Sequence, residues 1–191
     1  MQSGDLTVTA TRLVEVIAQI SYDFWESERF RQAVGFSQLS RIEQDRIFNE
    51  LEVTILGFVA LQAEQYPLLI DLKQETVRSF LQVMRELGLE DQFIETWKLL
   101  IKVRFKEYKI DYRQVLKNSR AWGDLGDKER LRVVWARIET LTVNCLSHIR
   151  RGKVNKNDPL WNDLRKWLTM IELTFDKVIQ TSMYRRPIGV C

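Results

Sequence analysis

This chain of 191 residues has little of the chemistry on which most enzyme active sites depend. It contains one histidine, two cysteines, three prolines and eight glycines. A closed zinc site needs four ligands, usually cysteine or histidine, so this chain would need carboxylates to complete one. Cys145 lies inside a helical apolar pattern and Cys191 is the last residue, which argues against a disulfide framework and favours a reducing compartment.

Motifs for catalysis and cofactor binding are also missing. The sequence has no glycine-rich phosphate loop, nucleophile elbow or zincin motif, and it lacks the Glu-x-x-His motifs of a di-iron bundle. His148 follows Cys145 by three residues, but this pair alone is an incomplete metal site. We expect no metal and no cofactor. The sequence favours a non-catalytic protein, although an active site that converges only in space would leave no motif.

Long apolar runs are absent as well. The longest extends from Ile55 to Leu61, far short of the roughly 20 residues that cross a bilayer. Residues 1–11 lack the basic and apolar segments of a secretory signal. We therefore expect a cytoplasmic protein with no transmembrane segment.

What the chain does have is apolar residues at helical spacing along almost its whole length. We predict an all-α protein, a single up-and-down bundle of about six long helices that form one domain over residues 1–191. The predicted helices span about residues 9–33, 40–65, 68–87, 91–120, 127–151 and 158–184. Residues 87–91 form a weak seam, too short and too apolar for a flexible linker.

Local signals predict several helix ends. Gly35 ends the first helix, and Ser40 followed by Glu43 is a capping box that begins the second. Asp158 before Pro159 is a strong start for the last helix.

The middle of the second predicted helix is apolar on every side, which places this helix at the centre of the bundle. Gly57 in this stretch costs about 1 kcal/mol relative to alanine and needs a reason. Close helix packing is one reason. A cavity for a small apolar molecule is the other, and it would make the protein a ligand-sensing bundle.

The charges are sorted along the chain. Residues 1–96 carry sixteen acidic and eight basic side chains, whereas residues 97–191 carry ten acidic and twenty-one basic ones. Such asymmetry indicates that the two halves neutralise each other in the fold, or that the basic half meets an anionic partner.

A basic stripe runs along the fourth predicted helix, with cations three or four residues apart within an arc of about 100°. Its members are Lys98, Lys102, Lys106, Lys109, Arg113, Lys117 and Arg120. Like charges at this spacing repel one another, so the stripe does not stabilise the helix itself. Its spacing fits a polyanion.

Two alternatives compete with that interpretation of the basic stripe. Acidic residues of the first half, such as Glu43, Glu50, Glu64 or Glu75, would lie against the stripe and neutralise it. Alternatively, a helix break at Asp111 would divide it into two ordinary solvated faces.

A second basic cluster, Arg150, Arg151, Lys153 and Lys156, lies at the end of the fifth predicted helix, which Asp127 would cap, and in the loop that follows. These cations either complement the helix dipole or contact phosphates. Trp122 lies in a glycine-rich loop after the basic stripe and is a candidate for stacking on a base.

Together these features predict an interaction module that binds an anionic partner, a nucleic-acid backbone or an acidic protein surface, through its basic half. Replacing Lys102, Lys106 and Lys109 with glutamate would abolish that binding. Besides the ligand-sensing bundle, a further alternative is self-assembly, with the acidic half of one copy on the basic half of another.

Overall fold

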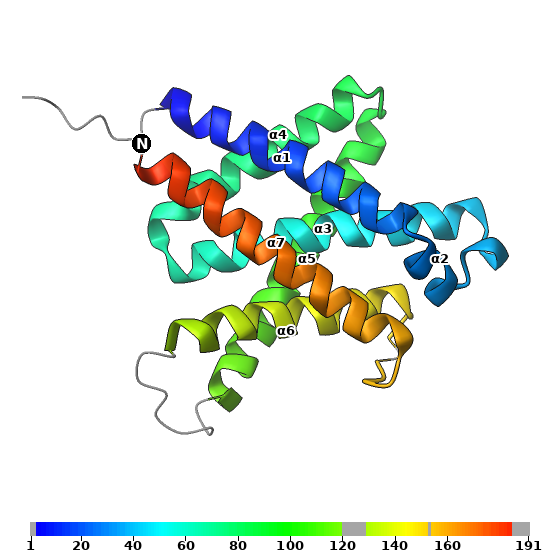
Figure 1. Ribbon diagram of the computed structural model, residues 1–191. Coiled ribbons are helices and arrows are strands. Elements are labelled where there is room, and N and C mark those ends of the chain that lie inside the picture. Colours follow the sequence, from blue (N-terminus) through cyan, green and yellow to red (C-terminus); the bar gives the residue numbers. More distant parts are fainter. Residues whose placement is uncertain (1–2, 120–128, 153, 185–191) are drawn as a thin grey trace, which may run out of the picture.

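In a computed structural model, the described residues, 3–119, 129–152 and 154–184, are almost entirely helical and contain no strand. The seven α-helices are α1 (Ser3–Glu26), α2 (Glu28–Val34), α3 (Arg41–Gln65), α4 (Ile70–Glu86), α5 (Asp91–Ser119), α6 (Glu129–Ile149) and α7 (Pro159–Tyr184). Two short 3₁₀ turns, Phe36–Gln38 and Pro67–Leu69, join neighbouring helices. The prediction of an all-α helical bundle is confirmed (Figure 1).

The first predicted helix is two helices, so its continuous span of 9–33 was wrong. Ser27 takes an extended conformation (φ −61°, ψ 131°) and its hydroxyl accepts a hydrogen bond from the backbone N–H of Phe30. The same hydroxyl donates to the carbonyl of Phe24 at 2.7 Å. A serine N-cap therefore starts α2 one residue after α1 ends.

Other helix ends follow the predicted signals. Gly35 closes α2 in the left-handed conformation with φ 68°, which glycine adopts without strain. Ser40 caps α3 by accepting from the N–H of Glu43, and Pro159 is the first residue of α7. The predicted cap at Asp127 lies outside the described residues.

Helix α3 lies in the middle of the bundle and packs against α1, α4, α5 and α6 (Figure 1). Every residue from Leu51 to Ala63 is buried, as the apolar pattern predicted. A Cβ atom at Gly57 would lie 2.8 Å from side-chain atoms of Leu141 and Tyr108. Close packing against α5 and α6 thus explains this glycine, which does not mark a ligand cavity.

The buried core draws on both halves of the chain. Trp97, Trp161 and Trp167 are buried in it, in keeping with their positions on apolar helix faces. Leu131, near the start of α6, is 64% exposed although it lies at helical spacing from the buried Ile138.

Among the described residues, no helix combines the length and the apolar character that crossing a membrane requires.

Candidate functional site

Helix α5 carries the basic stripe without interruption. It is continuous from Asp91 to Ser119, so the break considered at Asp111 does not occur. The Asp111 carboxylate accepts a hydrogen bond from the Asn144 amide at 2.9 Å, which ties α5 to α6 in place of capping a new helix. Six stripe residues therefore share one helix, whereas Arg120 and Trp122 lie outside the described part of the chain.

Part of the basic stripe is neutralised inside the fold. Glu64, near the end of α3, lies 2.6 Å from the Lys109 ammonium and 3.3 Å from the Arg113 guanidinium. Lys98 pairs at 2.6 Å with Glu95, three residues earlier on α5. The alternative in which an acidic residue of the first half neutralises the stripe thus holds for Lys109 and Arg113, which both pair with Glu64.

Three lysines of the stripe remain available. Lys102, Lys106 and Lys117 are exposed, and none of them makes an ion pair or hydrogen bond with any residue the structure describes. Lys102 and Lys106 lie on successive turns of one helix face and Lys117 lies about three turns further along it, so their positive charge is presented to solvent.

An exposed apolar row borders these lysines. Leu99, Val103 and Ile110 are 62%, 48% and 57% exposed. At about 100° per residue they lie on the side of α5 opposite Ile101 and Tyr108, which face the core. The sequence analysis did not predict this row, although three large apolar residues outside the buried stripe of α5 are a signal for it.

A shallow hollow of about 340 Å³ lies on the same surface. It is lined by Val103, Arg104, Lys106, Glu107, Ile110 and Asp111. Apolar and charged groups therefore meet on this face of α5, which offers a partner both a recess and cations.

The other acidic residues considered for the stripe have different partners. The buried Glu50 carboxylate binds Arg104, which is not a stripe residue, through two hydrogen bonds of 2.6 and 3.0 Å. Arg104 also lies 3.3 Å from Glu107, whose carboxylate is 3.0 Å from the His148 ring. This network joins α3, α5 and α6. Glu75 pairs instead with Arg78 on its own helix.

The second basic cluster is engaged within the fold. Arg150 makes two hydrogen bonds to Asp158, at 2.8 and 2.9 Å, and a third to the Ala33 carbonyl at 2.8 Å. Although burial opposes it, the hydrogen bond from Arg150 holds the pKa of Asp158 below its ordinary value. Arg151 pairs with Glu43, and Lys153 lies outside the described residues.

The two clusters are separate surfaces. Arg151 is bound near the start of α3 through Glu43, whereas Lys109 is bound near its end through Glu64. Those two glutamates are about 30 Å apart along the helix. A single flat partner contact spanning both clusters is therefore not indicated.

Two groups with potential reaction chemistry, the Cys145 thiol and the Tyr108 hydroxyl, are buried. The Cys145 thiol is buried, and burial raises its pKa to about 12, so it is a poor nucleophile. Burial also raises the pKa of Tyr108 well above its ordinary value. In the described ranges no group of three or more histidine, cysteine, aspartate or glutamate side chains is placed to hold a metal ion.

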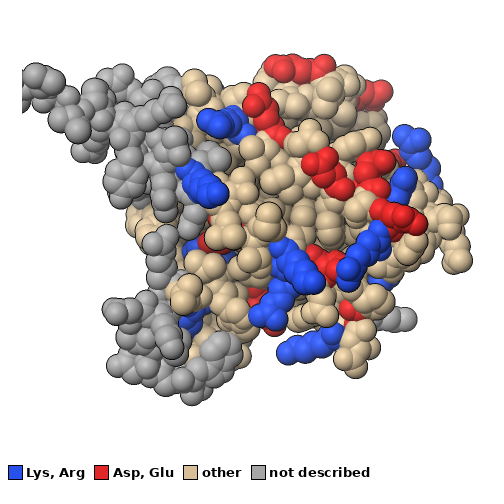
Figure 2. All heavy atoms as spheres, in the orientation of Figure 1, with Lys and Arg blue, Asp and Glu red and all other residues tan. Residues whose placement is uncertain are grey.

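On one face of the molecule, charges of both signs occur together. On the face that α1 and α7 present to the viewer, basic and acidic side chains both occur and lie next to each other at several points (Figure 2). Like Arg12 and Lys166 on α1 and α7, the lysines Lys102, Lys106 and Lys117 have no acidic partner among the described residues.

A comparison with protein-family models finds no match for this chain, and searches among curated proteins and among solved structures find no similar protein.

Proposed function

We propose that the solvent face of α5 is a docking surface for an acidic amphipathic helix of a partner protein. The observation that carries the proposal is the exposed apolar row Leu99, Val103 and Ile110 beside three lysines that have no acidic partner in the described structure. Apolar side chains gain from being covered, and the lysines supply the complementary charge.

The spacing of the row suits a helix as the occupant. Leu99, Val103, Lys106 and Ile110 are separated by four, three and four residues, the spacing of a coiled-coil seam. A partner helix with apolar residues at the same spacing would pack along α5 at a shallow angle of about 20°. Acidic residues on its edge would then face Lys102, and an acidic residue within its seam would face Lys106.

The same observations weigh against the other occupants. A phosphate backbone would pair with the lysines but leave the apolar row in water. A second copy of the chain docked through the same face would bring one basic stripe against another, which costs binding energy. A self-assembly contact of that kind is therefore disfavoured.

The direct test uses a labelled helical peptide of about four heptads, with leucine and isoleucine at the seam and glutamate at the flanks. Binding to the full chain is followed by fluorescence anisotropy at several salt concentrations. Mixed-sequence RNA, duplex DNA and vesicles of anionic lipid are measured in parallel. We expect saturable binding of the peptide that weakens as salt rises.

Two double variants separate the two parts of the surface. Lys102→Glu with Lys106→Glu should weaken peptide binding by roughly tenfold or more, because like charges then face each other. The matched control is Arg12→Glu with Lys166→Glu, which changes net charge equally at exposed sites on α1 and α7. That control should bind as the unmodified chain does.

The apolar row has its own variant. Val103→Ser with Ile110→Ser should also weaken peptide binding, whereas Met170→Ser with Leu173→Ser, at apolar positions 65% and 55% exposed on α7, should not. Nucleic-acid binding that depends on the lysines but not on the row would replace this proposal with a phosphate-backbone site. Binding to vesicles alone, or to no probe, would refute it.

As part of this proposal the protein acts in the cytoplasm and without catalysis. The support is the sparse cysteine and histidine content and the burial of Cys145 in a reduced state. A mass measured by light scattering that falls as salt rises would instead support charge-driven self-assembly.

A further inference from the structure

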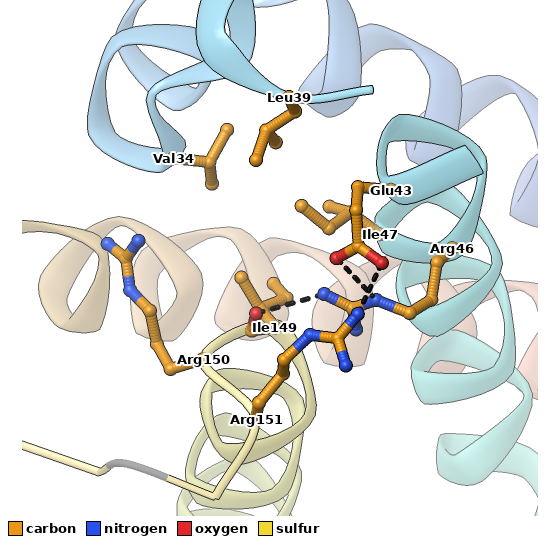
Figure 3. Close-up of a pocket in the computed structure, with 8 residues that line it drawn as sticks. All are labelled: Val34, Leu39, Glu43, Arg46, Ile47, Ile149, Arg150 and Arg151. Atoms are coloured by element: carbon orange, nitrogen blue, oxygen red, sulfur yellow. Dashed lines mark hydrogen bonds and ion pairs between the residues drawn. The ribbon is translucent and has the colours of Figure 1, made fainter. Parts of the chain in front are cut away.

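A small pocket lies where the start of α3 meets the ends of α2 and α6 (Figure 3). Its volume is about 200 Å³, below the roughly 300 Å³ at which pockets for drug-sized ligands begin. It is lined by Val34, Leu39, Glu43, Arg46, Ile47, Ile149, Arg150 and Arg151. Three arginines, one glutamate and four aliphatic residues thus line the pocket, and in Figure 3 the Arg150 guanidinium points away from those of Arg46 and Arg151.

Arg151 is held there by an unusual backbone conformation. Its φ of 54° is the one positive value at a non-glycine residue in the described chain. The N–H of Gly152 bonds the Ser147 carbonyl at 2.7 Å, and that of Arg151 approaches the His148 carbonyl at 3.4 Å. This is the helix ending in which glycine normally occupies the left-handed position. An arginine in that position is strained, and such strain concentrates at binding sites.

The three arginines differ in how many of their side-chain nitrogens donate hydrogen bonds. Arg46 employs all three of its nitrogens, on Glu43 and on the carbonyls of His148 and Ile149, so it mainly closes the end of α6. Arg151 uses only Nη2, on Glu43. Arg150 uses Nε and Nη2. Within the described chain, Nη1 of both Arg150 and Arg151 has no hydrogen-bond acceptor.

The Glu43 carboxylate is an anionic group that is already bound by two arginines of this pocket. In Figure 3 this carboxylate points between Arg46 and Arg151, and both arginines bond to it. The hydrogen bond from Arg151 lowers the pKa of Glu43, so this carboxylate stays ionised. Because Arg151 is 70% exposed in its side chain, it can leave Glu43 without opening the core.

We propose that this pocket binds a small organic phosphate with a short aliphatic group, the phosphate taking the place of Glu43 on Arg151 and accepting from both Nη1 and Nη2 of that arginine. A phosphate monoester offers more oxygens to guanidinium donors than the single carboxylate does. The aliphatic group would lie against Val34, Leu39 and Ile149. This inference is independent of the docking surface on α5.

Butyl phosphate is the first probe, measured by isothermal titration calorimetry on the full chain, with inorganic phosphate and butanol as comparators. We expect one saturable site for butyl phosphate. Inorganic phosphate should bind about tenfold more weakly, because it lacks the aliphatic group, and butanol should not bind.

Two variants decide the role of the arginine and of the resident carboxylate. Arg151→Gly should weaken butyl phosphate binding at least severalfold, yet keep or raise the melting temperature, because glycine relieves the left-handed strain. Glu43→Gln should tighten binding severalfold, because the competing carboxylate is gone. Arg78→Ala, which removes a 72% exposed arginine paired with Glu75 on α4, is the control and should leave binding unchanged.

Absence of saturable butyl phosphate binding would overturn the proposal. So would equal affinities in Arg151→Gly and the unmodified chain, or weaker binding in Glu43→Gln. The lysine and apolar-row variants of α5 should leave butyl phosphate binding unchanged, which separates a failure here from a failure of the docking surface.

Discussion

Glu52 places a carboxyl side chain in the apolar interior of the bundle. It is 4% exposed in the middle of α3, and it makes no hydrogen bond or ion pair among the described residues. Burial raises its pKa from an ordinary value of 4.5 to about 8. The folded chain therefore holds this carboxyl protonated at neutral pH, whereas the unfolded chain ionises it.

Stability should consequently fall as pH rises between about 4.5 and 8, by about 1 kcal/mol per pH unit from this group, and level off above that range. Glu52→Gln removes the proton loss on unfolding, so the variant should gain stability over the unmodified chain steadily from pH 5 to pH 8. Urea unfolding at each pH measures this difference. Glu15→Gln, at an exposed carboxyl on α1, is the control. A constant difference across the pH range would contradict the assignment.

At the scale of the element, some lysines of α5 form ion pairs within the bundle and others are exposed without an acidic partner in the described chain. Lys109 contributes to the bundle through Glu64, whereas Lys106, three residues earlier, has no such partner in the described chain. The triple replacement that the sequence suggested, at Lys102, Lys106 and Lys109, would therefore mix a folding effect with a binding effect. The structure favours changing Lys102 and Lys106 without Lys109.

This difference can be measured directly. Lys109→Glu places a second carboxylate beside Glu64 and should lower the free energy of unfolding by up to about 1 kcal/mol, since the pair is partly exposed. Lys106→Glu should leave stability unchanged or slightly raised, because the new carboxylate would lie near Lys102 and Lys109. Thermal unfolding of the two variants at low salt compares them. Equal losses would mean that the pair with Glu64 does not contribute.

At the scale of the whole molecule, one buried ion pair joins the helices of the basic half to the centre. Arg137 of α6 and Glu172 of α7 are 3% and 2% exposed in their side chains and bond to each other. Arg137 also donates to the Gln65 side chain at the end of α3, at 2.7 Å. The Arg137 guanidinium thus links α3, α6 and α7 through hydrogen bonds.

Removing one partner of such a pair leaves a buried charge. Glu172→Leu should therefore destabilise the chain by about 3 kcal/mol, and Arg137→Met added to it should restore most of that loss. Chemical unfolding of the two single variants and the double variant gives the coupling. Additive losses in the double variant would show that the two side chains do not act as a pair.

The helices were predictable from the sequence because each one carries a local signal. Ser40 and Glu43 mark the start of α3, and Pro159 marks the start of α7. Ser27 was overlooked because apolar spacing continues across it, and a cap in the middle of such a pattern looks like an ordinary helical serine.

The sites were less predictable, because they depend on contacts between distant segments. The stripe on α5 could be read from spacing alone, but its partner Glu64 lies 45 residues before Lys109 in sequence. The pocket at Arg151 joins α3 to α6, and only the folded backbone puts that arginine in the left-handed conformation. The spacing of residues in the sequence indicates which of them share a helix face. It does not indicate which residues of another helix pack against that face.

The enclosure of α3 also affects how this protein is made. A helix whose residues from Leu51 to Ala63 are all buried leaves the ribosome before α5, α6 and α7 have been synthesised. Its apolar surface is then uncovered in the nascent chain, which invites chaperone binding or aggregation until the C-terminal half arrives. The basic half therefore completes the fold during biosynthesis, and a chain interrupted after α4 would be a substrate for quality control.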